Sequence, residues 1–377
     1  KMIVTRFNNK VQKRILVFVT DAFGGRGGIS KFNRDFLNVL CSYPSTKEVV
    51  ALPRKLVDPL EELPNKLTYI IEGANNKIRF GITALQAIQK NPKFDLIICG
   101  HINLLPLAYA VHSYTKAPLL LVIHGIDAWK PSPSPLANYL SRYVDGVISV
   151  SDFTLKRFIN WVKPKYAQFF ILPNAVQLEN YAPGTKPKDL LEKYSLHNKK
   201  VLLTLGRLAG EERYKGFDEV LEAMPSLLSE YPDLVYIIAG EGGDRDRLEA
   251  KVTKLKLNDQ VRFTGFVSED RKADYYRLAD AFLMPSQGEG FGIVLLEAMA
   301  CAIPVMASKL DGSYEALMQG KLGITVDPTD SNSVIQGIKE VLTLPKAVPA
   351  ELDHFSFENF EKRSHSILDQ FFSEHLQ

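Results

Sequence analysis

The sequence is poor in cysteine, holding only Cys41, Cys99 and Cys301 in 377 residues. Three widely separated cysteines fit neither a disulfide framework nor a metal knuckle, so a disulfide-stapled secreted scaffold is excluded and a reducing compartment is indicated. Long apolar runs are also missing. The longest, such as APLLLVIHGI, suit buried strands rather than a membrane span. Lys and Arg number 46 against 43 Asp and Glu, and no nucleic-acid partner is expected.

The start of the chain also lacks something. The segment KMIVTRFNNKVQKR is polar and has no apolar signal-peptide core. The expected location is therefore the cytoplasm, either free or peripheral at the inner face of the membrane.

The charge is unevenly distributed along the chain. Residues 1–180 hold 23 Lys and Arg against 12 Asp and Glu, a net +11, whereas residues 181–377 hold 23 against 31, a net −8. Two interpretations stay open: chance drift of solvated surfaces, or a first half that faces an anionic membrane surface or a phosphate-bearing acceptor. The basic and aromatic stretch KRFINWVKPKY (156–166) suits a lipid headgroup interface, unless Phe158 and Trp161 simply face the core.

Both halves of the chain open with the same pattern. In the first, the apolar run RILVFVT (14–20) leads into the glycine-rich turn DAFGGRGGIS and then into KFNRDFLNVLCSY, which has helical spacing. In the second, KVLLTLGR (200–207) leads through LAGEERYKG into FDEVLEAMPSLLSEY. Alternating strands and helices predict parallel sheets covered on both faces. Further predicted strands are FDLIICG, PLLLVIHG, GVISVS, LVYIIAG, VRFTGF and AFLMPS.

The expected class is therefore α/β, with two Rossmann-like doubly wound domains and a cleft between them. Residues 173–189 are rich in Pro, Gly, Asn and Lys without apolar periodicity, which predicts a boundary there. We predict an N-terminal domain over 1–178 and a C-terminal domain over 179–356. An amphipathic helix over about 357–377 is a candidate to pack back on the first domain.

A dinucleotide-binding enzyme is the first alternative for such a fold, but its fingerprint is poor. In GGRGGIS, Gly25 and Gly27 fit the first two positions of G-x-G-x-x-G, whereas Ser30 occupies the third. No acidic residue follows the next strand, EVVALPRK, to hold a ribose. A nicotinamide enzyme is therefore the weaker hypothesis.

The segment GEGFGIVLLEAMACAIPV (288–305) places Glu289 and Glu297 eight positions apart, around a glycine-rich helix start. The first N–H groups of a helix carry the positive end of its dipole and form an anion site. A carboxylate on each side of that site can accept from sugar hydroxyl pairs, as a nucleotide sugar requires. The alternatives are that Glu289 caps the helix and Glu297 is a solvated residue. A glycoside hydrolase also uses two carboxylates, but they would have to flank a glycosidic bond rather than an anion site, so we reject this function.

Two cations can hold the phosphates of such a ligand. Arg207 follows a strand at its carboxyl end, where ligands bind in these sheets, and Lys215 lies eight residues further on. Both side chains can make charge-assisted bonds to one diphosphate. The alternative is a surface loop with scattered charges.

Together, GEGFGIVLLEAMACAIPV, the GRL…RYKG segment and the N-terminal GGI loop resemble the family-4 retaining glycosyltransferases of GT-B fold, over nearly the whole chain. The resemblance implies that Arg207 and Lys215 bind the donor diphosphate, Glu297 the ribose and Glu289 the transferred sugar. The interdomain PNGVD of the family is PNAVQ here, which affects the hinge more than the chemistry. Further donor contacts implied by the resemblance are Gly27, Gly28, Gly240, Phe266, Val267, Gly290, Phe291, Gly292 and Ile293, and His124 would contact the transferred sugar.

The function expected from this resemblance is transfer of a hexose, with retention, from UDP-glucose or a related UDP-hexose to a saccharide or lipid-linked acceptor, in the synthesis of cell-surface polysaccharide or glycoconjugate. The expected catalytic residues are His124, Arg207, Lys215 and Glu289. We expect no metal or other cofactor, because cationic side chains and a helix N-terminus can stabilise the leaving diphosphate. A sugar-nucleotide epimerase of the same architecture and a non-catalytic nucleotide-sugar-binding module remain alternatives.

Overall fold

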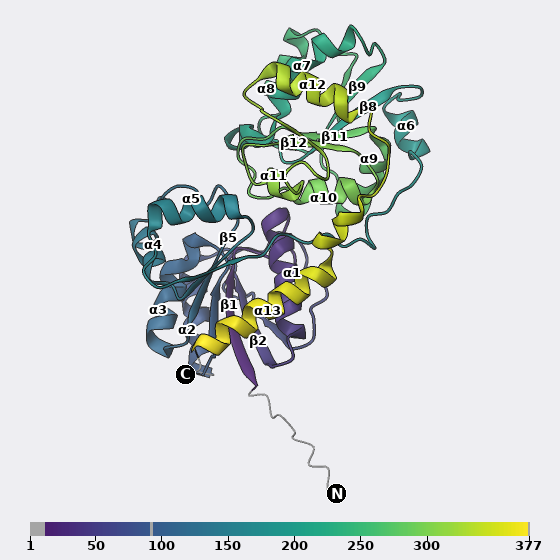
Figure 1. The fold of residues 1–377 in the computed structure, drawn as a ribbon. Coiled ribbons are helices and arrows are strands. Elements are labelled where there is room, and N and C mark those ends of the chain that lie inside the picture. The colour runs from purple at the N-terminus through teal and green to yellow at the C-terminus, as the bar shows by residue number, and fades with distance from the viewer. Residues whose placement is uncertain (1–11, 91–92, 376–377) are drawn as a thin grey trace, which may run out of the picture. The chain divides into compact units, whose positions relative to one another are not determined.

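The computed structural model describes residues 12–90 and 93–375, which form two compact units (Figure 1). The first unit comprises residues up to Ser149, Leu155–Leu172 and the chain from Glu361, and the second comprises Val150–Thr154 and Pro173–Phe360. Most of the polar N-terminal segment on which the expected location depends lies outside the described residues. Each described helix is too short or too polar to span a bilayer.

The first unit is built on a seven-stranded parallel sheet in the order β3-β2-β1-β4-β5-β6-β7. Its central strands are almost wholly apolar and buried, as expected for a sheet covered on both faces. The strands are β1 (Lys13–Val19), β2 (Thr46–Pro53), β3 (Leu67–Tyr69), β4 (Leu96–Cys99), β5 (Leu119–Ile123), β6 (Gly146–Ser149) and β7 (Gln168–Ile171).

Helices cover both faces of this sheet. Side chains of α2 (Lys77–Lys90), α3 (Leu105–Thr115), α4 (Pro135–Leu140) and α5 (Asp152–Val162) share one hydrophobic cluster with the strands. On the other face lie α1 (Gly28–Ser42) and the C-terminal helix α13 (Phe357–His375) (Figure 1). The Tyr43 hydroxyl, after α1, donates to Asp369 of α13 at 2.6 Å.

The second unit is built on a six-stranded parallel sheet in the order β10-β9-β8-β11-β12-β13. Chain order reverses beside β8, whose neighbours are β9 and β11, so the loops after β8 and β11 diverge at a topological switch point. The strands are β8 (Lys200–Leu205), β9 (Leu234–Ala239), β10 (Val261–Phe263), β11 (Ala281–Met284), β12 (Val305–Ser308) and β13 (Ile324–Val326).

Two layers of helices cover this second sheet (Figure 1). One layer, α7 (Phe217–Leu228), α8 (Arg245–Lys254) and α12 (Ser331–Val341), shares a hydrophobic cluster with the strands. The other consists of α6 (Lys188–Lys193), α9 (Lys272–Leu278), α10 (Ile293–Ala300) and the short α11 (Ser313–Ala316). The predicted α/β class with two Rossmann-like domains is confirmed, and every predicted strand is present.

Candidate donor-binding site

The loops after β8 and β11 meet at the switch point of the second unit. Lys215 ends the loop after β8, and its ammonium lies 3.1 Å from the Glu289 carboxylate in the loop after β11. Both side chains are about four-fifths buried, with relative exposures of 19% and 21%. The structure therefore brings together a cation and an acid that are 74 residues apart in the sequence.

Close backbone packing holds these two loops together. The Gln287 N–H donates to the Tyr214 carbonyl at 2.7 Å, and a Cβ on Gly288 would lie 2.4 Å from the Tyr214 ring. Only glycine fits at position 288 without displacing the tyrosine. The glycine-rich sequence thus lets the loop after β11 come close enough for Glu289 to reach Lys215.

The loop after β11 ends at the N-terminus of α10. Gly292 has a φ of 94° and occupies the N-cap position, so the helix begins at Ile293. No side chain of the described residues caps it, and the alternative that Glu289 is a helix cap is therefore wrong. The first amides of α10 follow the buried Gly290 and Phe291 and carry the positive end of the helix dipole.

Arg207 and the predicted base-lining residues surround the same edge of the sheet. Arg207 is exposed and follows β8 after one glycine. A Cβ on Gly240, which follows β9 and has a φ of 139°, would lie 1.9 Å from the Gly206 carbonyl, so the adjacent strand ends can approach this closely only because residue 240 is a glycine. After β10, Phe266 is 51% exposed whereas Val267 is 9% exposed.

Glu297 lies deeper than the sequence predicts. It is fully buried on α10, where its carboxylate accepts from the Tyr276 hydroxyl at 2.7 Å and lies 3.7 Å from the Lys272 ammonium. The interpretation of Glu297 as a solvated helix residue is therefore wrong. Its contact with a ribose stays a prediction, and a ligand that reaches it must displace the side chains that cover it.

Asp311 is a buried residue of this site that the sequence analysis missed. Its carboxylate accepts from the Glu289 N–H at 2.9 Å, the Ser286 hydroxyl at 2.7 Å, and both the N–H and hydroxyl of Ser313. The following amide, Gly312 N–H, donates to the Glu289 carbonyl at 2.9 Å. The backbone of Glu289 is therefore held on both sides by Asp311 and Gly312. In the sequence, Asp311 stands in SKLDGS, three residues after the end of β12.

The buried position of Asp311 makes a prediction about pH. Burial raises the pKa of this carboxyl to about 6, although the hydrogen bonds from Ser313, Ser286 and the Glu289 amide counteract the shift. Because the folded-state pKa exceeds the unfolded value of about 3.9, the ionised form destabilises the fold above pH 6, and this penalty disappears as the pH falls toward 4. Asp311→Asn cannot titrate. We expect the stability of the wild type relative to Asp311→Asn to rise by about 2 kcal/mol from pH 7 to pH 4, measured by urea denaturation at both pH values; an unchanged difference contradicts the assignment.

The remaining predicted residues lie in the first unit. Gly27 and Gly28 are exposed; Gly27 has a φ of 90° at the N-cap of α1, and Gly28 begins that helix. Between β1 and Gly27, Arg26 forms a 2.6 Å ion pair with Asp58. The glycine-rich segment thus lies between β1 and α1, as the sequence predicts, and its last two residues, Gly28 and Ile29, begin the helix.

His124 follows β5 and is 9% exposed. Its Nε2 lies 2.9 Å from the Gly100 carbonyl, which can only accept, so Nε2 carries the proton. Burial, the dominant effect, lowers the pKa of His124 despite the nearby Asp127. At neutral pH the imidazole is therefore neutral, with Nδ1 as its acceptor. Asp127 lies 3.8 Å from His101, and its Oδ2 is buried without a hydrogen-bond partner among the described residues.

In the described parts of the chain, no three His, Cys, Asp or Glu side chains are grouped as metal ligands would be.

Comparison with known proteins identifies similar glycosyltransferases. Residues 188–354 match the family model of glycosyl transferases group 1. A GDP-mannose-dependent alpha-(1-6)-phosphatidylinositol monomannoside mannosyltransferase of Mycolicibacterium smegmatis is 30% identical over 58% of this chain and 59% of its own length. A D-inositol 3-phosphate glycosyltransferase of an Arthrobacter species is 28% identical over 73% of this chain and 66% of its own. The matches thus span about three-fifths to two-thirds of these relatives.

Solved structures share the fold over nearly the whole chain. A sucrose-phosphate synthase of Thermosynechococcus elongatus has a TM-score of 0.76 at 21% identity and covers 96% of this chain and 100% of its own. Anabaena HepE in complex with UDP-glucose has a TM-score of 0.72 at 19% identity, over 95% of this chain and 100% of its own. The chain has the GT-B fold, and residues 188–354 of its second unit are similar to the glycosyl transferases group 1. The resemblance drawn from the sequence motifs is confirmed.

Proposed function

We propose that this protein transfers a hexose from a nucleoside diphosphate sugar to a saccharide or lipid-linked acceptor. The observation that carries the proposal is the Lys215–Glu289 pair at the switch point of the second unit, beside the uncapped N-terminus of α10. A cation and a helix N-terminus suit a diphosphate, and a carboxylate suits the hydroxyl groups of the attached sugar.

The chemistry follows from these groups. The diphosphate leaves as negative charge builds on it, and Lys215, Arg207 and the α10 amides are arranged to stabilise that charge. Binding of the diphosphate would draw Lys215 away from Glu289 and release the carboxylate for a sugar hydroxyl. We further propose retention of configuration by same-face attack, with the acceptor proton passing to the leaving phosphate, so that no protein nucleophile is needed.

The donor proposed from the sequence is UDP-glucose or a related UDP-hexose. HepE, a structural neighbour, was crystallised with UDP-glucose, whereas the Mycolicibacterium relative is described as GDP-mannose-dependent. UDP-glucose and GDP-mannose are therefore the two donors to compare. For the acceptor, the phosphatidylinositol mannoside in that relative's name supports a lipid-linked class.

Titration calorimetry with UDP and with GDP tests the phosphate contacts. Lys215→Met and Arg207→Met each remove a charge-assisted partner, so each is expected to weaken the preferred nucleotide by about 1.5–3 kcal/mol, roughly ten- to 150-fold. Lys199→Met, which removes an ion pair with Asp233 on the same unit, is the matched control and should bind normally. Unchanged affinity in both site variants would refute this placement of the diphosphate.

Independence from divalent metal is a further proposal, because cationic side chains are available at the phosphate site. Hexose transfer measured in excess EDTA is expected to proceed at the rate seen with added magnesium or manganese. Complete loss in EDTA that either metal restores would show that a metal ion is required.

The two alternative functions would give different results with a nucleotide-sugar donor. A sugar-nucleotide epimerase would release a free nucleotide or an isomerised sugar without any acceptor, and a binding module would bind the nucleotide sugar and leave it intact. Labelled donors incubated with and without acceptors separate these cases.

Peripheral contact with the inner face of the membrane is also proposed, from the net charge of +11 in residues 1–180.

A further inference from the structure

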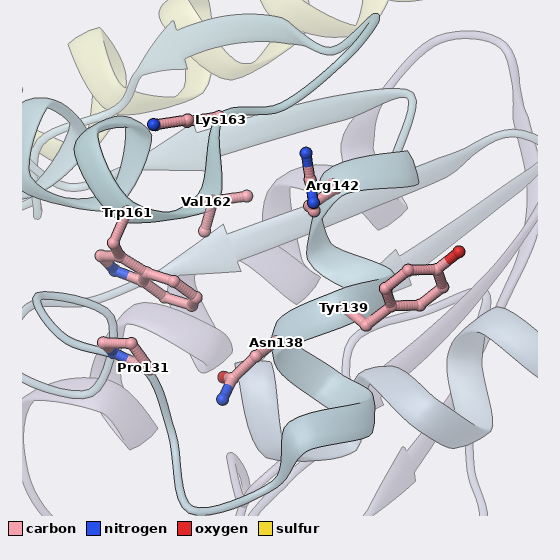
Figure 2. Close-up of a pocket in the computed structure, with 7 residues that line it drawn as sticks. All are labelled: Pro131, Asn138, Tyr139, Arg142, Trp161, Val162 and Lys163. Carbon is pink, nitrogen blue, oxygen red and sulfur yellow. The ribbon is translucent and has the colours of Figure 1, made fainter.

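A pocket of about 430 Å³ opens on the first unit, between the end of α4 and the C-terminal end of α5 (Figure 2). Neither His124 nor Gly27 lines it, and it lies outside the predicted donor contacts. Its lining combines cationic, aromatic and amide side chains: Pro131, Asn138, Tyr139, Arg142, Trp161, Val162 and Lys163.

The walls of this pocket are fixed by satisfied hydrogen bonds. The Asn138 amide accepts from the Ser132 N–H and donates to the Ser132 carbonyl, both at 2.8 Å. The Trp161 indole donates to the Ala128 carbonyl at 2.8 Å and packs edge-on against Phe158, which is fully buried. Of the two interpretations of Phe158, the one in which it faces the core is therefore correct. Trp161 instead forms a preorganised pocket wall.

The cations at the pocket, by contrast, have no acidic partners among the described residues. Neither Arg142 nor Lys163 forms an ion pair within residues 12–90 and 93–375, and the Arg142 Nε is buried without a hydrogen-bond partner. The Lys165 N–H donates to the Arg142 carbonyl at 3.0 Å. This bond holds the loop that contains Lys163 and Lys165 against this edge of the pocket. A buried guanidinium nitrogen without a partner favours an anionic ligand.

Lys163 has a left-handed backbone conformation. Lys163 has a φ of 51°, in the left-handed region where glycine is favoured, just after the end of α5. A cation near a helix C-terminus gains from the dipole, but the side chain incurs strain in this conformation. The same combination occurs at Lys116 after α3, where φ is 64°, so either lysine can be replaced by glycine without new backbone strain.

Exposed apolar side chains accompany the pocket. Tyr139 in its wall is 55% exposed, and Leu136, one turn earlier on α4, is also 55% exposed. Tyr166, directly after Lys165, is 86% exposed. Basic and aromatic residues together are typical of proteins that bind at the headgroup layer of a bilayer.

We propose that this pocket binds the phosphate of an anionic phospholipid headgroup, held by Arg142 and Lys163, while Tyr139 and Leu136 contact the interface. The pocket would be the place at which the protein contacts the membrane, and this inference rests on the peripheral membrane contact in the proposed function. The pocket residues are distinct from the predicted donor contacts, so the two sites can be tested separately.

The test is co-sedimentation with phosphatidylcholine vesicles with and without phosphatidylglycerol, at low and moderate salt. The wild type should bind the anionic vesicles selectively, and Lys163→Gly and Arg142→Gln should each weaken that binding about tenfold. Lys116→Gly is the matched control: Lys116 is exposed, directly follows α3 and has a φ of 64°. It removes the same charge and relieves the same strain, so it should bind nearly as the wild type does.

Each other outcome overturns the proposal. Equal losses in Lys163→Gly and Lys116→Gly would show general electrostatic attraction without a pocket. Binding of soluble glycerol 3-phosphate without binding of vesicles would make the ligand a soluble phosphate ester. Thermal melting should show Lys163→Gly to be at least as stable as the wild type. UDP and GDP titrations on the same variants show separately whether the donor site works, so its failure cannot be confused with failure of the pocket.

Discussion

Replacing Glu297 with glutamine is expected to lower the free energy of unfolding by about 3–5 kcal/mol. Lys272 is largely buried, and its pKa is raised: burial lowers it, but Glu297 and Glu269 together outweigh that effect. Among the described residues, removing the Glu297 charge leaves the lysine with only Glu269, whose side chain is 62% exposed. The amide keeps an acceptor for the Tyr276 hydroxyl, so the expected loss reports the missing charge. Urea denaturation at pH 7 measures it.

The matched control is the double variant Lys272→Met with Glu297→Gln. It removes both charges, so most of the lost stability should return, because replacing a buried ion pair with uncharged side chains is often nearly neutral. A double variant as unstable as Glu297→Gln alone would show that the carboxylate acts through other contacts. Nucleotide binding by Glu297 variants is to be compared only under conditions in which they are folded.

Replacing Glu289 with glutamine is expected to separate binding from turnover. The substitution releases Lys215 from its 3.1 Å ion pair, so the affinity for nucleoside diphosphate should stay the same or increase. Transfer should nevertheless slow on the order of 10²-fold, because the carboxylate that would hold the transferred sugar is lost. Calorimetry with the free nucleotide and steady-state rates with the donor measure the two effects.

Lys215→Met is the contrasting variant, since it should weaken nucleotide binding through loss of a phosphate contact. The double variant completes a thermodynamic cycle that gives the coupling energy of the pair. Equal loss of nucleotide affinity in Glu289→Gln and Lys215→Met would mean that both residues act on the phosphates, and the assignment of Glu289 to the sugar would be wrong.

The repeating units of the fold could be predicted from the sequence because buried parallel strands are continuous apolar runs. RILVFVT and KVLLTLGR are bounded by polar or glycine-rich turns and became β1 and β8. The strand β12 (Val305–Ser308) was not separated from α10, because both are apolar and only the short turn ending in Pro304 divides them. The short β3, β7 and β13 contain partly exposed residues and give weak patterns.

Part of the candidate site could be predicted, namely the residues whose charge suits the ligand and which follow a strand in the sequence. Arg207, Lys215 and Glu289 each follow a strand, and the carboxyl ends of adjacent parallel strands lie at one edge of the sheet. What the sequence could not show is pairing across space. Asp311 gives no periodic signal, and its role depends on Glu289, 22 residues earlier. The depth of Glu297 is likewise set by the packing of α9 over α10, which local spacing does not reveal.

The most direct test of the central claim is transfer of labelled hexose from UDP-glucose and from GDP-mannose to saccharide and lipid-linked acceptors. The account predicts that one donor yields a glycosylated acceptor and free nucleoside diphosphate in equal amounts, and that Glu289→Gln nearly abolishes this product while still binding the nucleotide. Tight binding of a donor that stays intact with every acceptor, or an isomerised sugar formed without one, would contradict it.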